Sequence, residues 1–543
     1  MSVRNGIALL LALSTLLFLA GCGSSSNSPA PVPPPSGNFS NANLNGTYVF
    51  SVSGTDEANS APYAIVGTLT ANGSGGITGG ALDINDAAFA ASQPVIPPAA
   101  NAPINSNSTY EISVDGRGQA KLGTSTPFGN ITLDFVLSTS SHGLVIEFDG
   151  VGTGSGTIDL QSAGTTPTGS YAFSFSGVTS AGTSATVGNF TLGSGGAIAS
   201  GLEDFNDGGF AYTDQPLSGN VVVGPSSTPG TTLITGQFGT LIFDVYAIDA
   251  THLKLIEMDQ VAIFSGDAYA QTSTTLPTGT LAFTLEGFYP TSATSLSAVG
   301  GFMVTDGAGN ITNASSEDVN EGGSVSPSPI TFTANYTAAP ASSGRYTLSN
   351  FATGFVGGSA YAAYPSSGGL LLLEIDNTGI MGGAAYTQTA GAAFAASQGY
   401  GLNLSGDNLS AGAEVDDIAE FAANSTGNTI TGLIDENSTS AVPVTFGAAL
   451  TSGTYVAPVN GRGAIAATAG TSSSNTTLNG GFALTFYTVD GTTFPFIESD
   501  SGQVSAGVFV LQNPSASSPG LAHPNMFVVR PLIRPHTARQ KKN

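Results

Sequence analysis

Apolar and polar residues alternate along most of the chain in short runs. Over 47–53, Tyr48, Phe50 and Val52 would share one face of an extended strand, and small polar residues would occupy the other face. The runs are bounded by Gly, Asn and Asp, and no stretch keeps an apolar period of 3.6 residues for three turns. This pattern predicts an all-β protein of antiparallel strands joined by tight turns, with almost no helix.

One apolar and acidic segment returns four times. The copies end at Asp149, Asp259, Asp376 and Asp500, so that successive copies are 259 − 149 = 110, 376 − 259 = 117 and 500 − 376 = 124 residues apart. This spacing is typical of small domains, not of the short units of a solenoid. The sequence therefore predicts four tandem domains that each bury their own core.

The alternation in the first copy predicts about eight strands. They lie near 47–53, 63–71, 76–84, 109–114, 118–122, 130–137, 143–149 and 155–161. Asn72-Gly73 and Asp115-Gly116 supply tight turns between neighbouring strands. Eight short antiparallel strands fit an up-and-down barrel or a two-sheet sandwich, and a propeller built from half-repeats is the remaining alternative.

The opening Gly46-Thr47-Tyr48 is similar to the Gly-x-Trp first strand of lipocalin- and avidin-like barrels. This resemblance to the calycin group implies a barrel and carries no functional residue.

Composition places the domain boundaries. We predict a signal peptide over 1–21, a tether over 22–43 rich in Ser, Asn and Pro, repeats over 44–163, 164–273, 274–390 and 391–513, and a basic tail over 514–543.

The N-terminal segment has the features of an export signal. An apolar run over 7–20 follows Arg4, and its 14 residues fall short of the roughly 20 that a membrane-spanning helix needs. The run ends in Leu19-Ala20-Gly21-Cys22, which resembles the lipobox of bacterial lipoproteins. The resemblance implies that Cys22 is diacylated and becomes the mature N-terminus. Gly23 and Ser24 directly follow Cys22, and neither is the Asp that tends to signal inner-membrane retention in lipoproteins. The resemblance therefore also implies an outer-membrane destination, on either the periplasmic or the surface face.

The cysteine count and the net charge bear on the stability of the fold and on the possible partners. Cys22 is the only cysteine among 543 residues, so no disulfide framework supports the fold. Without Arg4 the mature chain carries 10 basic and 36 acidic residues, a formal charge of 10 − 36 = −26. So acidic a body repels nucleic acid and anionic lipid, which we exclude as partners of the body.

Acidic residues gather at two places in each repeat, after the third and the seventh predicted strand. In an up-and-down arrangement both strands end at the same rim, where residues i and i+2 present paired oxygens. Calcium needs six to eight oxygen ligands, and possible Ca²⁺ is the one cofactor that the pattern suggests. The candidate ligands are Asp83, Asn85, Glu147, Asp149, Asp204, Asn206, Glu257, Asp259, Asp318, Asn320, Glu374, Asp376, Asp435, Asn437, Glu498 and Asp500. The alternative is that the Asp and Asn residues cap strand ends and that the Glu residues are solvated at the rim, beside the long loop 87–108.

Other polar residues suggest no catalytic centre. No Gly-x-Ser-x-Gly motif occurs, His142 and His252 are interpreted as exposed turn residues, and Arg117 and Arg462 as turn residues without a further role. The rim carboxylates could serve as the acid and base of an inverting glycosidase, but catalytic pairs are rarely reproduced in every tandem domain.

The sequence thus predicts a non-catalytic cell-envelope lipoprotein, anchored to the lipid bilayer through acylated Cys22, that binds or spaces an unknown envelope or extracellular ligand. The alternative is an envelope enzyme that acts on polysaccharide. The basic tail is expected to be solvated, or to act as an arm that pairs with an acidic body or with anionic envelope polymers.

Overall fold

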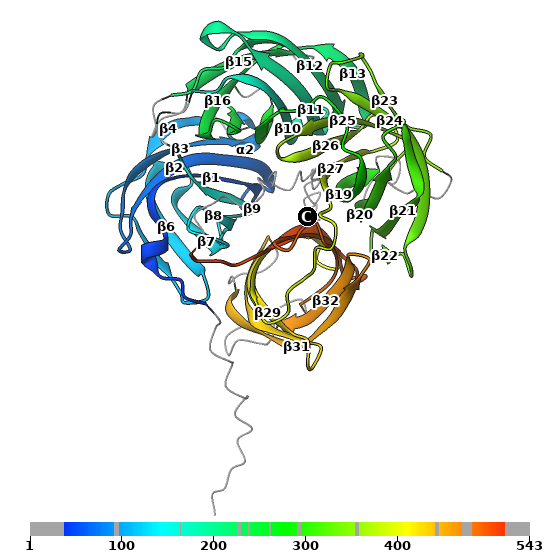
Figure 1. Ribbon diagram of the computed structural model, residues 1–543. Coiled ribbons are helices and arrows are strands. Elements are labelled where there is room, and N and C mark those ends of the chain that lie inside the picture. Colours follow the sequence, from blue (N-terminus) through cyan, green and yellow to red (C-terminus); the bar gives the residue numbers. More distant parts are fainter. Residues whose placement is uncertain are drawn as a thin grey trace, which may run out of the picture. The chain divides into compact units, whose positions relative to one another are not determined.

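A computed structural model describes residues 37–515, apart from 92–96, 163, 165, 225–229, 237–238, 260–261, 290–294, 353–357, 440–444 and 470–480. The predicted signal peptide, Cys22, most of the tether and the basic residues of the tail lie outside the described residues. The described chain is almost entirely β, as the alternation predicts (Figure 1).

The first repeat forms one nine-stranded antiparallel sheet in the order β4-β3-β2-β1-β9-β8-β7-β6-β5. Its elements are η1 (Asn41–Asn43), β1 (Asn45–Asp56), β2 (Ala61–Asn72), β3 (Ile77–Asp86), α2 (Ala87–Ala91), β4 (Ala99–Pro103), β5 (Thr109–Ile112), β6 (Arg117–Thr126), β7 (Gly129–Leu137), β8 (His142–Glu147) and β9 (Gly152–Leu160). Strands that are neighbours in sequence pair, except β4 and β5 at the two ends of the sheet, and β1 also pairs with β9. A backbone bridge between Gly76 and Thr109 links the two ends of the sheet.

The second repeat has the same order, β13-β12-β11-β10-β18-β17-β16-β15-β14. Its elements are β10 (Gly169–Thr179), β11 (Gly182–Leu192), η2 (Ser194–Gly196), β12 (Ile198–Asp207), β13 (Phe210–Pro216), β14 (Ser218–Asn220), β15 (Gly230–Gly236), β16 (Gly239–Asp249), β17 (His252–Glu257) and β18 (Ile263–Ala270). A bridge between Ala197 and Asn220 again links the ends of the sheet.

The third and fourth repeats close completely. In the third, β20–β21 pairing joins the ends of β19 (Gly279–Tyr289), β20 (Ser295–Thr305), β21 (Asn310–Glu321), β22 (Ser324–Val325), β23 (Ile330–Ala338), β24 (Tyr346–Ser349), β25 (Ala360–Ser366), β26 (Gly369–Glu374) and β27 (Ile380–Thr387). The fourth is a barrel of β28 (Gly399–Asn408), β29 (Ala413–Asn424), β30 (Thr429–Ser438), β31 (Thr445–Val459), β32 (Arg462–Ala469), β33 (Phe482–Tyr487), β34 (Thr493–Glu498) and β35 (Gln503–Leu511). Of the predicted architectures, the up-and-down barrel is observed in the third and fourth repeats, whereas the first and second repeats are open, half-barrel sheets whose ends are linked by a single backbone bridge.

Each repeat has its own hydrophobic core. In the first, Tyr48, Phe50 and Val52 point into the barrel and are at most 1% exposed, which confirms the face that their alternation predicted. The other three repeats have equivalent clusters. Further apolar clusters join neighbouring repeats, such as Val49 and Val66 with Tyr246 and Ile256. Strands at these contacts are therefore apolar on both faces, as in Leu370–Leu373.

The sequence prediction differs from the structure in one segment of the first repeat. The expected long loop 87–108 begins with α2 and contains β4, whose pairing with β3 extends the sheet. The sequence does not indicate β4, because Ala99–Pro103 is rich in Ala and Pro, lacks β-branched residues and has no apolar alternation. Among the described residues, no helix has the length and the apolar character that a membrane crossing requires.

Candidate functional site: the joints between repeats

An asparagine near the end of the third strand of each repeat reaches into the next repeat. Asn85 of β3 donates its side-chain N–H to the main-chain carbonyl of Glu257 on β17, at 2.8 Å. The same contact recurs from Asn206 to Glu374 at 2.9 Å, from Asn320 to Glu498 at 3.1 Å and from Asn437 to Glu147 at 2.7 Å. Since the last contact runs from the fourth repeat to the first, the four contacts form a closed cycle. We call the four regions of contact joints 1–2, 2–3, 3–4 and 4–1.

A glutamine at the end of each repeat follows the same cycle. Its side-chain amide donates to a main-chain carbonyl of the next repeat, and in joint 4–1 Gln512 reaches the carbonyls of both Asp115 and Leu137, at 2.7 and 3.0 Å. The other three contacts run from Gln161 to Ala247 at 2.7 Å, from Gln271 to Pro365 at 3.0 Å and from Gln388 to Thr488 at 2.8 Å. Gln161, Gln271, Gln388 and Gln512, one at the end of each repeat, are therefore joint residues.

The aspartate two residues before the asparagine also crosses each joint. Asp83 accepts a hydrogen bond from the Tyr246 hydroxyl at 2.6 Å. In the other joints the carboxylate binds an arginine, with Tyr364 or Tyr487 added in two of them. The contacts are Asp204 with Arg345 (2.6 Å to Nε), Asp318 with Arg462 (2.8 Å to both Nε and Nη2) and Asp435 with Arg117 (2.9 Å).

These contacts correct the interpretation of the arginines as turn residues without a further role. Arg117 is 7% exposed and also binds Asp115, its neighbour in the turn. Arg345 is the equivalent arginine of the third repeat, which the sequence interpretation took to have lost it. Its turn reads Ser343-Gly344-Arg345, where the first and fourth repeats have Asp115-Gly116-Arg117 and Asn460-Gly461-Arg462. In joint 1–2 no arginine faces Asp83 among the described contacts, and burial raises the pKa of Asp83 to about 7.

The recurring glutamate is buried, which corrects the expectation of a solvated rim. Glu147, Glu257, Glu374 and Glu498 are each 0% exposed. Each lies two residues after an apolar residue that points into the barrel, so alternation places its side chain inward as well. The Asp two residues later in the same motif lies close to each glutamate and is itself an acid. Among the described residues, none of the four glutamates takes part in an ion pair.

Burial sets the protonation of these glutamates. Burial, together with the adjacent Asp259 and Asp376, raises the pKa of Glu257 to about 10 and that of Glu374 to about 9. Burial would also raise the pKa of Asp376, but hydrogen bonds from Ser359, Thr378 and Glu374 hold it at about 2. Glu374 therefore keeps its proton and shares it with an ionised Asp376.

The Asp at i+2 of each motif accepts hydrogen bonds from its own turn or the neighbouring strand. Asp149 accepts from the Val151 amide at 2.9 Å, and Asp500 accepts from the Gly502 amide at 2.7 Å. Asp259 accepts from the Ile242 amide at 2.9 Å. These side chains stabilise the turns at the joints.

The two acidic motifs, at the ends of the third and the seventh predicted strands, meet between repeats and not within one repeat. The contacts of the third-strand motif run to the seventh-strand motif of the next repeat, not to that of the same repeat. Within the described residues, no three His, Cys, Asp or Glu side chains converge as a metal-ligating group. The asparagines present amide nitrogen to the carbonyls. Calcium binding by these residues stays a prediction.

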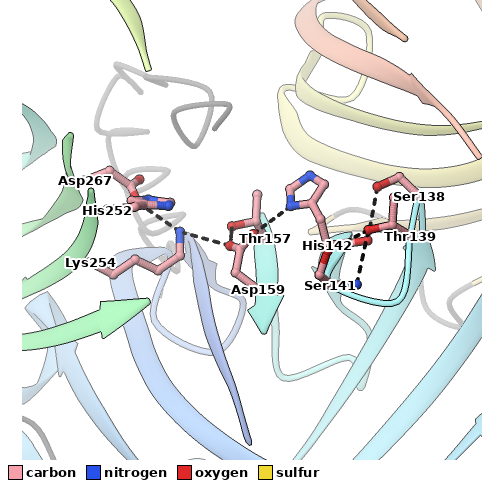
Figure 2. A network of polar contacts seen from close by, with 9 residues as sticks. All are labelled: Ser138, Thr139, Ser141, His142, Thr157, Asp159, His252, Lys254 and Asp267. Atoms are coloured by element: carbon pink, nitrogen blue, oxygen red, sulfur yellow. Dashed lines mark hydrogen bonds and ion pairs between the residues drawn. The ribbon is translucent and has the colours of Figure 1, made fainter. Parts of the chain in front are cut away.

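Joint 1–2 carries an additional buried network that the sequence did not indicate (Figure 2). Lys254 on β17 is 0% exposed, lies 3.0 Å from Asp267 on β18 and approaches Asp159 of the first repeat to 4.0 Å. His142 contacts Asp159 and His252 contacts Asp267, both at 2.7 Å.

This network corrects the interpretation of His142 and His252 as exposed turn residues. They are 5% and 6% exposed, because each begins a strand and its ring packs against a buried Asp at the joint. Burial would raise the pKa of both aspartates, but the contact with His142 lowers the pKa of Asp159, and Lys254 lowers that of Asp267. Both carboxylates are therefore held ionised.

Comparison with known proteins adds no family. Neither a protein-family model nor a curated protein matches the chain. Among solved structures, transferrin binding protein B of serogroup B Neisseria meningitidis is 10% identical, with a TM-score of 0.19, 70% of this chain and 85% of that chain covered. A double mutant of transferrin binding protein B from Haemophilus parasuis gives 10% identity and a TM-score of 0.18, with 68% and 83% covered. Likenesses at these TM-scores carry no argument about this chain.

Proposed function

We propose that this chain is a non-catalytic lipoprotein of the cell envelope, whose four-repeat body is a rigid module that binds or spaces a ligand outside the membrane. The observation that carries the proposal is the use of the recurring polar residues. The Asn, the third-strand Asp and the Glu that return in every repeat are buried at the joints, and the recurring Gln, partly exposed in three repeats, also donates hydrogen bonds across them. Four joints of the same form suit a rigid scaffold.

The alternative, a polysaccharide-acting enzyme with rim carboxylates, finds no support in this geometry. An acid and a base must reach the glycosidic oxygen and a water molecule. The four glutamates that would have to do so are fully buried. They also lie in four similar environments, whereas catalysis needs two carboxyls whose pKa values are set apart for different roles.

Anchoring rests on the N-terminal sequence. The apolar run, its length and the unique cysteine at the end of a lipobox-like segment support acylation of Cys22 and outer-membrane placement. We expect Cys22→Ser to leave the chain unprocessed or soluble. Mass spectrometry of the N-terminal peptide and membrane fractionation test this expectation. Unchanged fractionation of Cys22→Ser, together with a wild-type peptide that carries no acyl mass, would refute the anchor.

A further inference from the structure

One cross-strand pair of the second repeat is charged where the other three repeats have uncharged residues. Lys254 on β17 lies directly opposite Asp267 on β18. In each repeat the first residue of the pair stands three positions before the recurring glutamate, and the other pairs are Leu144 with Thr157, Leu371 with Ala384, and Pro495 with Val508. Burying two charges has a desolvation cost that their attraction need not recover. The repeat fold therefore does not require a charged pair at this position.

The amine of Lys254 is held against the carboxyl group of Asp267. Its Nζ lies 3.0 Å from Oδ1, the oxygen bonded to Cγ. Lys254 is 0% and Asp267 1% exposed, so both groups are out of bulk water. Reacting groups fixed at roughly 3–3.5 Å behave as one molecule and react far faster than the same groups free in solution. A lysine amine that has lost its proton is a nucleophile. The pair thus holds the two reactants of an amide bond in contact.

Two neighbouring side chains are placed to transfer protons (Figure 2). Asp159 of the first repeat lies 4.0 Å from the Lys254 amine and can accept a proton from it. His252 Nε2 lies 2.7 Å from Oδ1 of Asp267, and it is the donor because an ionised carboxylate only accepts. The ring of Tyr269 stacks on the imidazole, with the ring centroids 4.4 Å apart, and keeps it in place.

We propose that Lys254 and Asp267 condense to an isopeptide bond, a covalent cross-link between β17 and β18. Asp159 accepts a proton from the ammonium group, and the amine then attacks Cγ of Asp267. The Nζ–Cγ bond forms and the Cγ–Oδ1 bond breaks while His252 protonates Oδ1. Two of the three ammonium protons leave with Oδ1 as water, and the third stays on the amide nitrogen. The reaction removes two opposite charges from a buried site and needs no oxidant or other reactant.

The cross-link adds a covalent tie to the rigid body, which has no disulfide because Cys22 is the only cysteine of the chain. A covalent link between two strands restricts the unfolded chain and so stabilises the folded one. Since Asp159 belongs to the first repeat, the bond forms after joint 1–2 has closed.

Mass spectrometry of the full chain, denatured and then cleaved after glutamate, tests the bond. Cleavage after Glu257 separates Lys254 from Asp267, so we expect two peptides that stay joined and are lighter than their sum by one water molecule. Lys254→Arg keeps the positive charge but has no amine, and its two peptides should separate at full mass. Asp267→Asn should stay joined with the loss of ammonia in place of water, because an amine can also displace the amide nitrogen. This variant keeps the shape of the side chain, so it tests the chemistry even where Lys254→Arg fails to fold.

Lys121→Arg is the matched control, because Lys121 is an exposed lysine of the first repeat. It should keep the joined peptides, whereas Asp159→Asn should lose most of them. Separate wild-type peptides of full mass, with Lys254 open to trypsin, would overturn the proposal. A loss of water that persists in Lys254→Arg would overturn it as well, since the water would then come from another site. An undiminished joined fraction in Asp159→Asn would overturn the role of Asp159 as the proton acceptor.

Discussion

The Asn437 side chain of the fourth repeat donates to the main-chain carbonyl of Glu147 in the first repeat at 2.7 Å, and to that of Gly152 at 2.8 Å. This pair of hydrogen bonds joins two repeats that are separated by about half the sequence. It has the same form as the contacts between consecutive repeats. The joint that closes the cycle is therefore built like the other three.

Removing this contact should weaken joint 4–1. Asn437→Leu would leave two buried carbonyls without their donor, and each unsatisfied group costs about 1–3 kcal/mol. We expect a lower free energy of unfolding in urea. Asn107→Leu is the matched control, because Asn107 is exposed and surface changes stay within about 0.5 kcal/mol. Equal stability of the two variants would show that the Asn437 contact does not hold the joint.

The arginine contacts allow a comparison between two joints. Arg117 is 7% exposed, so Arg117→Met would leave Asp435 buried without its cation, at a cost of about 3–5 kcal/mol. The Arg462 side chain is 37% exposed, so Arg462→Met should cost about 1 kcal/mol or less. Urea unfolding of both variants measures the difference, and a larger loss for Arg462→Met would contradict it.

The strands were predictable from sequence because alternation is a local property. The predicted strand 109–114 corresponds to β5 (Thr109–Ile112), and 143–149 corresponds to β8 (His142–Glu147). Alternation could also have predicted the burial of the glutamate. Glu147 follows Val145 by two residues, and Val145 lies in the core of the first repeat. A residue on the core face is buried even at the end of its strand.

The joints were not predictable because their contacts depend on how separate barrels pack. Asn85 and Glu257 are 172 positions apart, and nothing in either local sequence indicates a partner. The recurrence of Gln at the end of every repeat could have indicated the joints, since the same polar side chain at four equivalent positions suggests four similar hydrogen-bond partners. Arg345 follows a glycine as Arg117 and Arg462 do, but Ser343 stands where those turns have Asp or Asn, and that one change hid the equivalence.

An excised second repeat tests how far the repeats depend on the joints. Residues 165–273 include a complete core of their own, built around Tyr171, Phe173 and Phe243, so we expect a folded domain with well-dispersed NMR signals. It would lose the partners of Asp204 in the third repeat, Arg345 and Tyr364. Its melting temperature should therefore lie below that of the full chain. Unfolded spectra would show that the repeats require their neighbours to fold.

The buried glutamates make stability depend on pH with a definite sign. The pKa of Glu374 is raised to about 9 and that of Glu257 to about 10, above an ordinary value of about 4.3. Between these values the folded chain keeps protons that the unfolded chain releases, so the free energy of unfolding falls as pH rises. The stabilisation is complete below about pH 4.3 and is lost as the pH passes through the folded pKa values. The lowered pKa of Asp376, about 2, acts in the opposite direction only in stronger acid.

We therefore expect a higher melting temperature at about pH 5 than at about pH 8, since the folded chain keeps protons that the unfolded chain releases over this range. Glu374→Gln is the test of the cause, because an amide of the same shape cannot ionise. This variant should lose part of the slope of melting temperature against pH while it remains folded. The double variant Glu257→Gln/Glu374→Gln should lose more of it, since the two carboxyls lie in different repeats and act independently. A slope identical to that of the wild type in both variants would mean that other buried acids, such as Asp83 at joint 1–2, set the pH dependence.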